Sequence, residues 1–137
     1  MILVIIRTYL IRLENKMLVK RVPFNMSGVA KAIAATDFTR KVQLGTLGRT
    51  MRIRHISVCN ETNGGVRANV GYVTDGIAYY VDTIVMTNDT YFYKSNVNML
   101  IPSDFQVIIK FVSPNAGDMF YYSVCGEEEI YMDNRDG

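Results

Sequence analysis

The chain has no tryptophan, one histidine, two cysteines and three prolines among its 137 residues. A single histidine and the lack of a Cys-x-x-Cys spacing leave no ligand set for zinc, so no metal site is expected. Cys59 and Cys125 are too few for a disulfide framework. Whether they pair stays open, but buried free thiols and synthesis in a reducing compartment are the expectation.

The sequence also lacks the motifs that catalysis needs. His55 lies within an expected strand, and neither Ser57 nor Ser123 has the surroundings of a nucleophile elbow. The stretch from Gly45 to Arg49 lacks the Lys-Ser/Thr end of a phosphate-binding loop. We therefore expect a protein that is not an enzyme and uses no cofactor.

What the chain does contain is a series of short strand-like runs separated by turn signals. Runs of this length at such regular spacing are typical of all-β sandwiches and barrels. We expect a single antiparallel β-sandwich, jelly-roll-like, with an extended N-terminal arm. The expected strands are residues 39–44, 51–60, 66–73, 77–85, 90–97, 106–113 and 119–124.

Local signals refine this expectation. The apolar parity changes at Arg54 and His55, which predicts a β-bulge. Asp75 and Gly76 predict a tight hairpin turn. Residues 99–104 are expected to form a loop with a buried apolar start.

The N-terminal part is expected to be an arm over residues 1–36, followed by a sandwich domain over 37–129 and an acidic tail over 130–137. The apolar start is too short, and too interrupted by Arg7 and Arg12, to span a bilayer. It also lacks the features of a signal peptide. Residues 17–24 are expected to be extended and 26–35 to form a short helix. The apolar start is expected to pack on its own domain or against a neighbouring chain.

Charge is divided unevenly along the chain. Residues 1–54 hold eleven basic and two acidic residues, a net charge of +9, whereas residues 55–137 hold four basic and eleven acidic residues, a net charge of −7. The two parts either neutralise each other within one molecule or promote association with a partner. Nucleic acid is not an expected partner, because few aromatic residues accompany the basic ones.

Three segments together resemble a β-sandwich module of tailed-phage virion proteins. They are residues 53–60, which follow an I-x-H-I-S-V-x-N pattern, residues 99–104, and residues 123–127. The resemblance spans residues 37–129, and Ser103 departs from the glycine that the pattern often has there. It implies a head decoration, cement or tail-associated protein that is made in the host cytoplasm and located in the virion.

From the resemblance and the arm we expect a capsid decoration or cement protein that stabilises the shell. Its partners would be the major capsid protein or other virion proteins, with self-association and no membrane. The alternatives are a tail or head-to-tail connector component, and a receptor- or carbohydrate-binding tail module that uses the tyrosine-rich strands. The residues expected to contact partners are Ile2, Val4, Ile6, Arg7, Tyr9, Leu10, Arg12, Arg40, Lys41, Arg49, Arg52 and Arg54.

Overall fold

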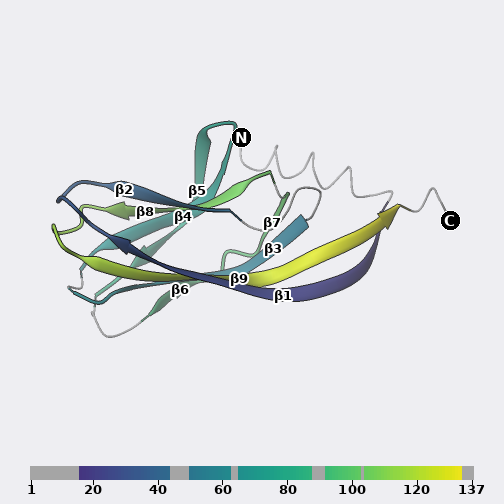
Figure 1. Cartoon of the computed structure of the whole chain (residues 1–137), viewed down its shortest axis with the longest axis horizontal. Helices are drawn as coiled ribbons and strands as arrows, with labels where there is room; N and C mark the ends of the chain where they lie inside the picture. The colour runs from purple at the N-terminus through teal and green to yellow at the C-terminus, as the bar shows by residue number, and fades with distance from the viewer. Residues whose placement is uncertain (1–15, 44–49, 63–64, 88–91, 103, 134–137) are drawn as a thin grey trace.

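The computed structural model describes residues 16–43, 50–62, 65–87, 92–102 and 104–133. Over these ranges the chain forms nine strands and no helix (Figure 1). Sheet A has the order β1 (Lys16–Lys31), β9 (Met119–Asp133), β3 (Thr50–Asn60), β6 (Tyr93–Ser95), and β7 (Met99–Pro102) also pairs with β3. Sheet B has the order β2 (Phe38–Gln43), β8 (Gln106–Val112), β4 (Arg67–Thr74), β5 (Ile77–Val85). The expected all-β fold with two antiparallel sheets is confirmed.

The strands pair in a nested order. The first described strand pairs with the last, β2 with β8, β3 with both β6 and β7, and β4 with β5, always antiparallel. Two further pairings, β3 with β9 and β4 with β8, join these pairs into the two sheets. Apart from the β4–β5 hairpin, the paired strands are therefore far apart in the sequence.

The two sheets enclose one hydrophobic core, as in a β-sandwich. Alternate side chains of each strand point into it, because successive residues of a strand face opposite sides of the sheet. Phe111 of β8 and Phe120 of β9 stack across the core with ring centres 4.2 Å apart, and Phe38 stacks on Phe111 at 4.9 Å. The contact between Phe111 and Phe120 joins sheet B to sheet A, whereas Phe38 and Phe111 stack within sheet B.

Several local predictions are confirmed. The strand expected over residues 77–85 coincides with β5, and the pairing of β3 with β9 shifts register between Ile53 and His55, where the bulge was predicted. Asp75 and Gly76 have φ angles of 52° and 73°, which a tight hairpin turn requires. Cys59 and Cys125 are both free thiols, the first buried and the second partly buried.

Four expectations are corrected. The short helix over residues 26–35 is wrong, since residues 26–31 belong to β1; pairing with β9 outweighs the helix propensity of the alanines. Residues 16–31 of the expected arm are thus a strand of sheet A. The expected acidic tail begins inside β9, which continues to Asp133, and the loop expected at 99–104 contains strand β7.

Candidate functional site

The residues expected to contact partners are divided by the structure. Arg40 and Lys41 are exposed on β2, at the edge of sheet B, and point to opposite faces of that sheet. Arg52 and Arg54 lie on β3 of sheet A. These four therefore do not form one continuous basic patch. The others lie outside the described residues: Ile2, Val4, Ile6, Arg7, Tyr9, Leu10, Arg12 and Arg49.

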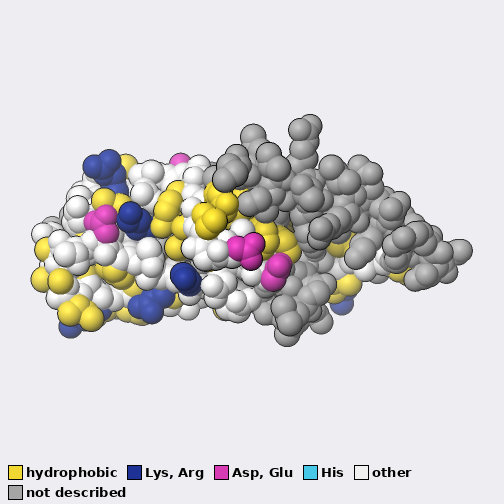
Figure 2. Space-filling model, turned by 90° about the horizontal axis from the view of Figure 1, so that it is seen from above, with side chains coloured by type: hydrophobic (Ala, Val, Ile, Leu, Met, Phe, Trp, Pro, Cys, Tyr) yellow, Lys and Arg dark blue, Asp and Glu magenta, His cyan; other side chains and the backbone are white. Residues whose placement is uncertain are grey.

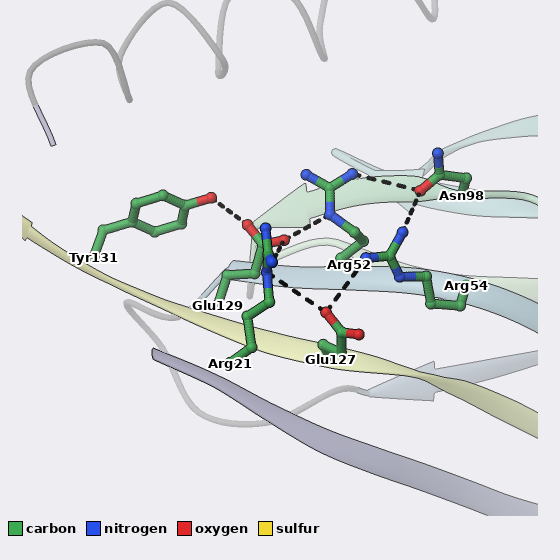
Figure 3. Close-up of polar contacts among 7 residues, drawn as sticks. All are labelled: Arg21, Arg52, Arg54, Asn98, Glu127, Glu129 and Tyr131. Carbon is green, nitrogen blue, oxygen red and sulfur yellow. Dashed lines mark hydrogen bonds and ion pairs between the residues drawn. The ribbon is translucent and has the colours of Figure 1, made fainter. Parts of the chain in front are cut away.

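Arg52 and Arg54 belong to an ionic cluster with two glutamates of β9 (Figure 3). Nε of Arg52 donates to Oε1 of Glu129 at 2.6 Å, and Nη2 of Arg54 donates to Glu127 at 3.4 Å. From β1, Nε of Arg21 lies 3.7 Å from a carboxylate oxygen of each glutamate. Three neighbouring strands thus contribute charge to one site.

Asn98 and Tyr131 complete this cluster. The side-chain oxygen of Asn98 accepts hydrogen bonds from Arg52 at 3.4 Å and from Arg54 at 3.5 Å (Figure 3). Asn98 has a φ of 43°, a left-handed conformation that asparagine tolerates better than most residues. On β9, the hydroxyl of Tyr131 donates to the carboxylate of Glu129. Both groups hold the charged side chains in fixed positions.

Glu129 is only 1% exposed, and burial of this kind disfavours the charged form of a carboxyl group. Burial is the largest single influence and acts to raise its pKa. The hydrogen bonds from Tyr131 and Arg52, with the charges of Arg52 and Arg21, outweigh burial, so the pKa of Glu129 lies below its usual value of 4.5. Burial and the hydrogen bond to Glu129 raise the pKa of Tyr131 to about 12. Glu129 is therefore a buried carboxylate that stays ionised near neutral pH.

The backbone at this site is fitted closely around a glycine. Gly126 on β9 pairs with Ile53, next to the bulge in β3. A Cβ atom at Gly126 would lie 1.9 Å from the carbonyl oxygen of Arg52, so no larger residue fits without a backbone shift. The glycine allows β9 to approach β3 where Arg52 and Glu129 meet.

This cluster shows that part of the opposite charge of the two halves of the chain is neutralised within one molecule. Arg21, Arg52 and Arg54 from the basic part pair with Glu127 and Glu129 from the acidic part, within one molecule. Six members of the site were not predicted from the sequence: Arg21, Asn98, Gly126, Glu127, Glu129 and Tyr131. The alternation of Glu127, Glu129 and Tyr131 was the available signal, since it places all three on one face of a strand.

A shallow groove lies on sheet A, toward the other end of its strands. Its volume is about 350 Å³, and its lining includes Val29, Phe92 and Tyr121 beside Ser27 and Ser123. Phe92 is 58% exposed and Val29 49% exposed. The hydroxyl of Ser123 donates to Asn25 at 2.7 Å. The groove thus combines exposed apolar groups with small polar ones.

The described part of the face seen in Figure 2 is mixed in character. On the face seen in Figure 2, hydrophobic patches are interspersed with separate Lys, Arg, Asp and Glu side chains. Among the described residues, no group of three or more His, Cys, Asp or Glu side chains is arranged to hold a metal ion. None of the described segments is a helix long and apolar enough to cross a membrane.

Comparisons with family models, curated proteins and solved structures found no match to this chain.

Proposed function

We propose that the protein is a non-enzymatic structural component of a virus particle, a decoration or cement protein that binds the capsid shell through its N-terminal arm and stabilises it. The observation that carries the proposal is the nested strand order. We assign the sandwich as a jelly roll, a double-sheet fold used in viral capsids and in lectins.

The pairing supports the jelly-roll assignment. A jelly roll is a long antiparallel hairpin rolled up so that successive strand pairs alternate between two sheets. Here β1 with β9 and β3 with β6 and β7 belong to sheet A, whereas β2 with β8 and β4 with β5 belong to sheet B. If β6 and β7 are counted as one interrupted strand, eight strands remain, which is the usual number.

The ionic cluster supports a structural role over a catalytic one. Arg52 and Glu129 are held by each other and by Tyr131, so the cluster's charges mainly join three strands of sheet A. A domain whose clustered charges are paired internally suits a subunit that must keep its shape on a particle. Binding to the shell is then assigned to the exposed Arg40 and Lys41 and to residues 1–13. Burial of the apolar surface of residues 1–13 would contribute roughly 25 cal/mol per Å² to the free energy of binding.

The test is the number and position of this chain in purified particles of the virus that encodes it, by cryo-electron microscopy with quantitative mass spectrometry. Many copies on the shell would support the proposal. A few copies at a vertex or tail would overturn it and favour a connector or tail protein.

A binding assay with stripped particles tests the arm itself. The full chain should bind, whereas a chain lacking residues 1–13 should not, provided that circular dichroism shows its sandwich intact. Replacing both Arg40 and Lys41 with alanine in the full chain should weaken binding less than the deletion. Normal binding by the shortened chain would contradict the role of the arm.

The groove on sheet A favours a second candidate, a saccharide-binding module of a tail. Tyr121 and Phe92 offer aromatic faces on which a sugar ring can stack, and Ser27 and Ser123 offer hydroxyls. The groove's volume of about 350 Å³ falls in the range of small-molecule sites. A glycan array probed with the full chain tests this, with Tyr121→Ala expected to abolish binding and Tyr80→Ala, on β5, expected to preserve it. Lack of signal for the unmodified chain would exclude the candidate for the glycans on the array.

A further inference from the structure

β1 forms one edge of sheet A, since β9 is its only strand neighbour among the described residues (Figure 1). The backbone N–H and C=O groups of an edge strand alternate, residue by residue, between the neighbouring strand and the open side. Just beyond β1, Ala32 donates its N–H to the carbonyl of Asp118 at 2.8 Å and accepts from the N–H of Gly117 at 2.7 Å. Even-numbered residues of β1 from Lys20 onward therefore bond toward β9, and odd-numbered residues face the open side.

Pro23 agrees with this alternation. It is odd-numbered, so its missing N–H falls on the open side, where no hydrogen bond to β9 is lost. Beyond Pro23, the open side of β1 carries the N–H and C=O groups of residues whose side chains are also exposed. They are Asn25, Ser27, Val29 and Lys31. Residues 25–31 are thus open to a further strand.

The features that keep such an edge from pairing lie mostly in the first half of β1. Bulges, prolines and lysines have this effect in natural sheets. In β1 the register shifts just after Leu18, and Lys20 and Pro23 follow. Residues 25–30 contain no proline, no charged side chain and no register shift. The second half of the edge is therefore unprotected.

Exposed apolar side chains mark both faces of this open stretch. Val29 lies on the outer face beside Tyr121 and is 49% exposed. Met26 has the same parity as the buried Ala30, which places it on the core face, yet it is 37% exposed. A strand beside β1 would cover both side chains, and an unprotected edge of this kind points to a strand partner.

We propose that residues 25–31 of β1 pair antiparallel with the same residues of a second copy of this chain, so that the two A sheets become one continuous sheet. A two-fold axis beside Gly28 makes Ser27 face Val29 of the second copy, and Asn25 face Lys31. Both members of each pair then have open-side N–H and C=O groups, so each pair exchanges two hydrogen bonds and the symmetric set makes about eight. Other two-fold registers either include Pro23, which cannot donate, or leave Asn25 without a partner.

Charge favours a second copy over a peptide of either sign. Residues 25–31 carry a single charge, on Lys31, and in this register Lys31 faces Asn25 and not another cation. Arg21, the next cation along the strand, lies 3.7 Å from carboxylate oxygens of Glu127 and Glu129 in its own molecule. The edge is therefore complementary to itself. The inference concerns the isolated chain and does not depend on the proposed role in a particle.

Sedimentation equilibrium of the full chain, over a roughly hundredfold range of concentration, tests the pairing. The unmodified chain should dimerise. In Val29→Lys two lysines meet diagonally across the axis, so the dissociation constant of the dimer should rise at least about tenfold. Val85→Lys is the matched control, because Val85 is 52% exposed on β5, an edge strand of sheet B, and it should dimerise as the unmodified chain does.

Val29→Pro is a second variant that acts on the backbone. It removes an open-side N–H without removing a hydrogen bond to β9, so it should weaken the dimer while circular dichroism shows the sandwich intact. If Val29→Pro fails to fold, Val29→Lys decides the outcome, since its side chain is exposed.

Disulfide trapping tests the register. Ser27→Cys and Val29→Cys chains, mixed and exposed to oxidised glutathione, should form a linked heterodimer at least about tenfold more than either chain alone forms a linked dimer. Mass spectrometry distinguishes this link from links to Cys59 or Cys125.

A chain that stays monomeric at every concentration would overturn the proposal, even if an extended segment of another protein bound the edge. So would equal dissociation constants for the unmodified chain and the Val29 variants. A dimer that Val85→Lys alone weakens would place the interface on sheet B and would also overturn it. A link formed mainly by Ser27→Cys with itself would overturn the axis beside Gly28.

Discussion

Nε of Arg52 lies 2.6 Å from Oε1 of Glu129, and the two residues are 77 positions apart in the sequence. Their contact joins β3 to β9 on the outer face of sheet A. Arg21 and Tyr131 also contact Glu129, so the carboxylate is surrounded by partners on three sides (Figure 3).

Substitution of either Arg52 or Glu129 should lower the free energy of unfolding. Arg52→Ala leaves the buried Glu129 carboxylate without its nearest cation, and we expect the free energy of unfolding to fall by about 3 kcal/mol. A double-mutant cycle with Glu129→Ala, measured by urea unfolding, should give a coupling energy of about 1–3 kcal/mol.

The ion pair between Lys110 and Asp37 is the control for that cycle. Its atoms are 3.8 Å apart and its side chains are 35% and 43% exposed. Solvent screens such a pair, so its coupling energy should be below about 1 kcal/mol. Equal coupling in the two cycles would contradict a special role for the buried pair.

Acid should weaken the protein partly through Glu129. Its pKa in the folded state lies below the usual value of 4.5, so its contribution to stability is present above that value and is lost as the pH falls through the folded pKa. Glu129→Gln cannot titrate and should lose less stability than the unmodified chain from about pH 5 downward. Urea unfolding at several pH values measures this, and parallel curves for the two proteins would count against it.

High pH should lower the stability of the folded protein partly through ionisation of Tyr131. Its pKa is raised from 10.0 to about 12, so the folded state holds the phenol proton more tightly than the unfolded state does. The resulting stability is present below pH 10 and is lost as the pH rises toward 12. Tyr131→Phe should therefore show a shallower loss of stability over this interval, and an unchanged slope would refute the assignment.

Gly126 should not tolerate even a methyl group. In Gly126→Ala the new Cβ meets the carbonyl oxygen of Arg52 at 1.9 Å, so β9 must move away from β3. We expect a loss of about 2–4 kcal/mol by thermal or urea unfolding. Cys125→Ala, one position earlier on the same strand, should cost less than about 1 kcal/mol, and a similar cost for both would show that the strands adjust easily.

Local patterns in the sequence were sufficient for several elements. A strand-like run bounded by turn signals predicted β5, the change of parity at Arg54 predicted the bulge, and Asp75 with Gly76 predicted the hairpin turn. Each of these signals lies within a few residues of the feature that it predicts. The same kind of reasoning failed over residues 26–31, where alanines favoured a helix and pairing with β9 produced a strand.

The sequence by itself determined the all-β class and the two oppositely charged parts of the chain. Only the tertiary structure decided that β1 pairs with β9 and that Arg21 and Arg52 meet Glu129. The physical reason is that strand pairing joins segments about a hundred residues apart, as when Arg21 meets Glu129. The hydrogen bonds of a strand are made with a neighbouring strand, and the identity of that neighbour is not written in the strand's own residues.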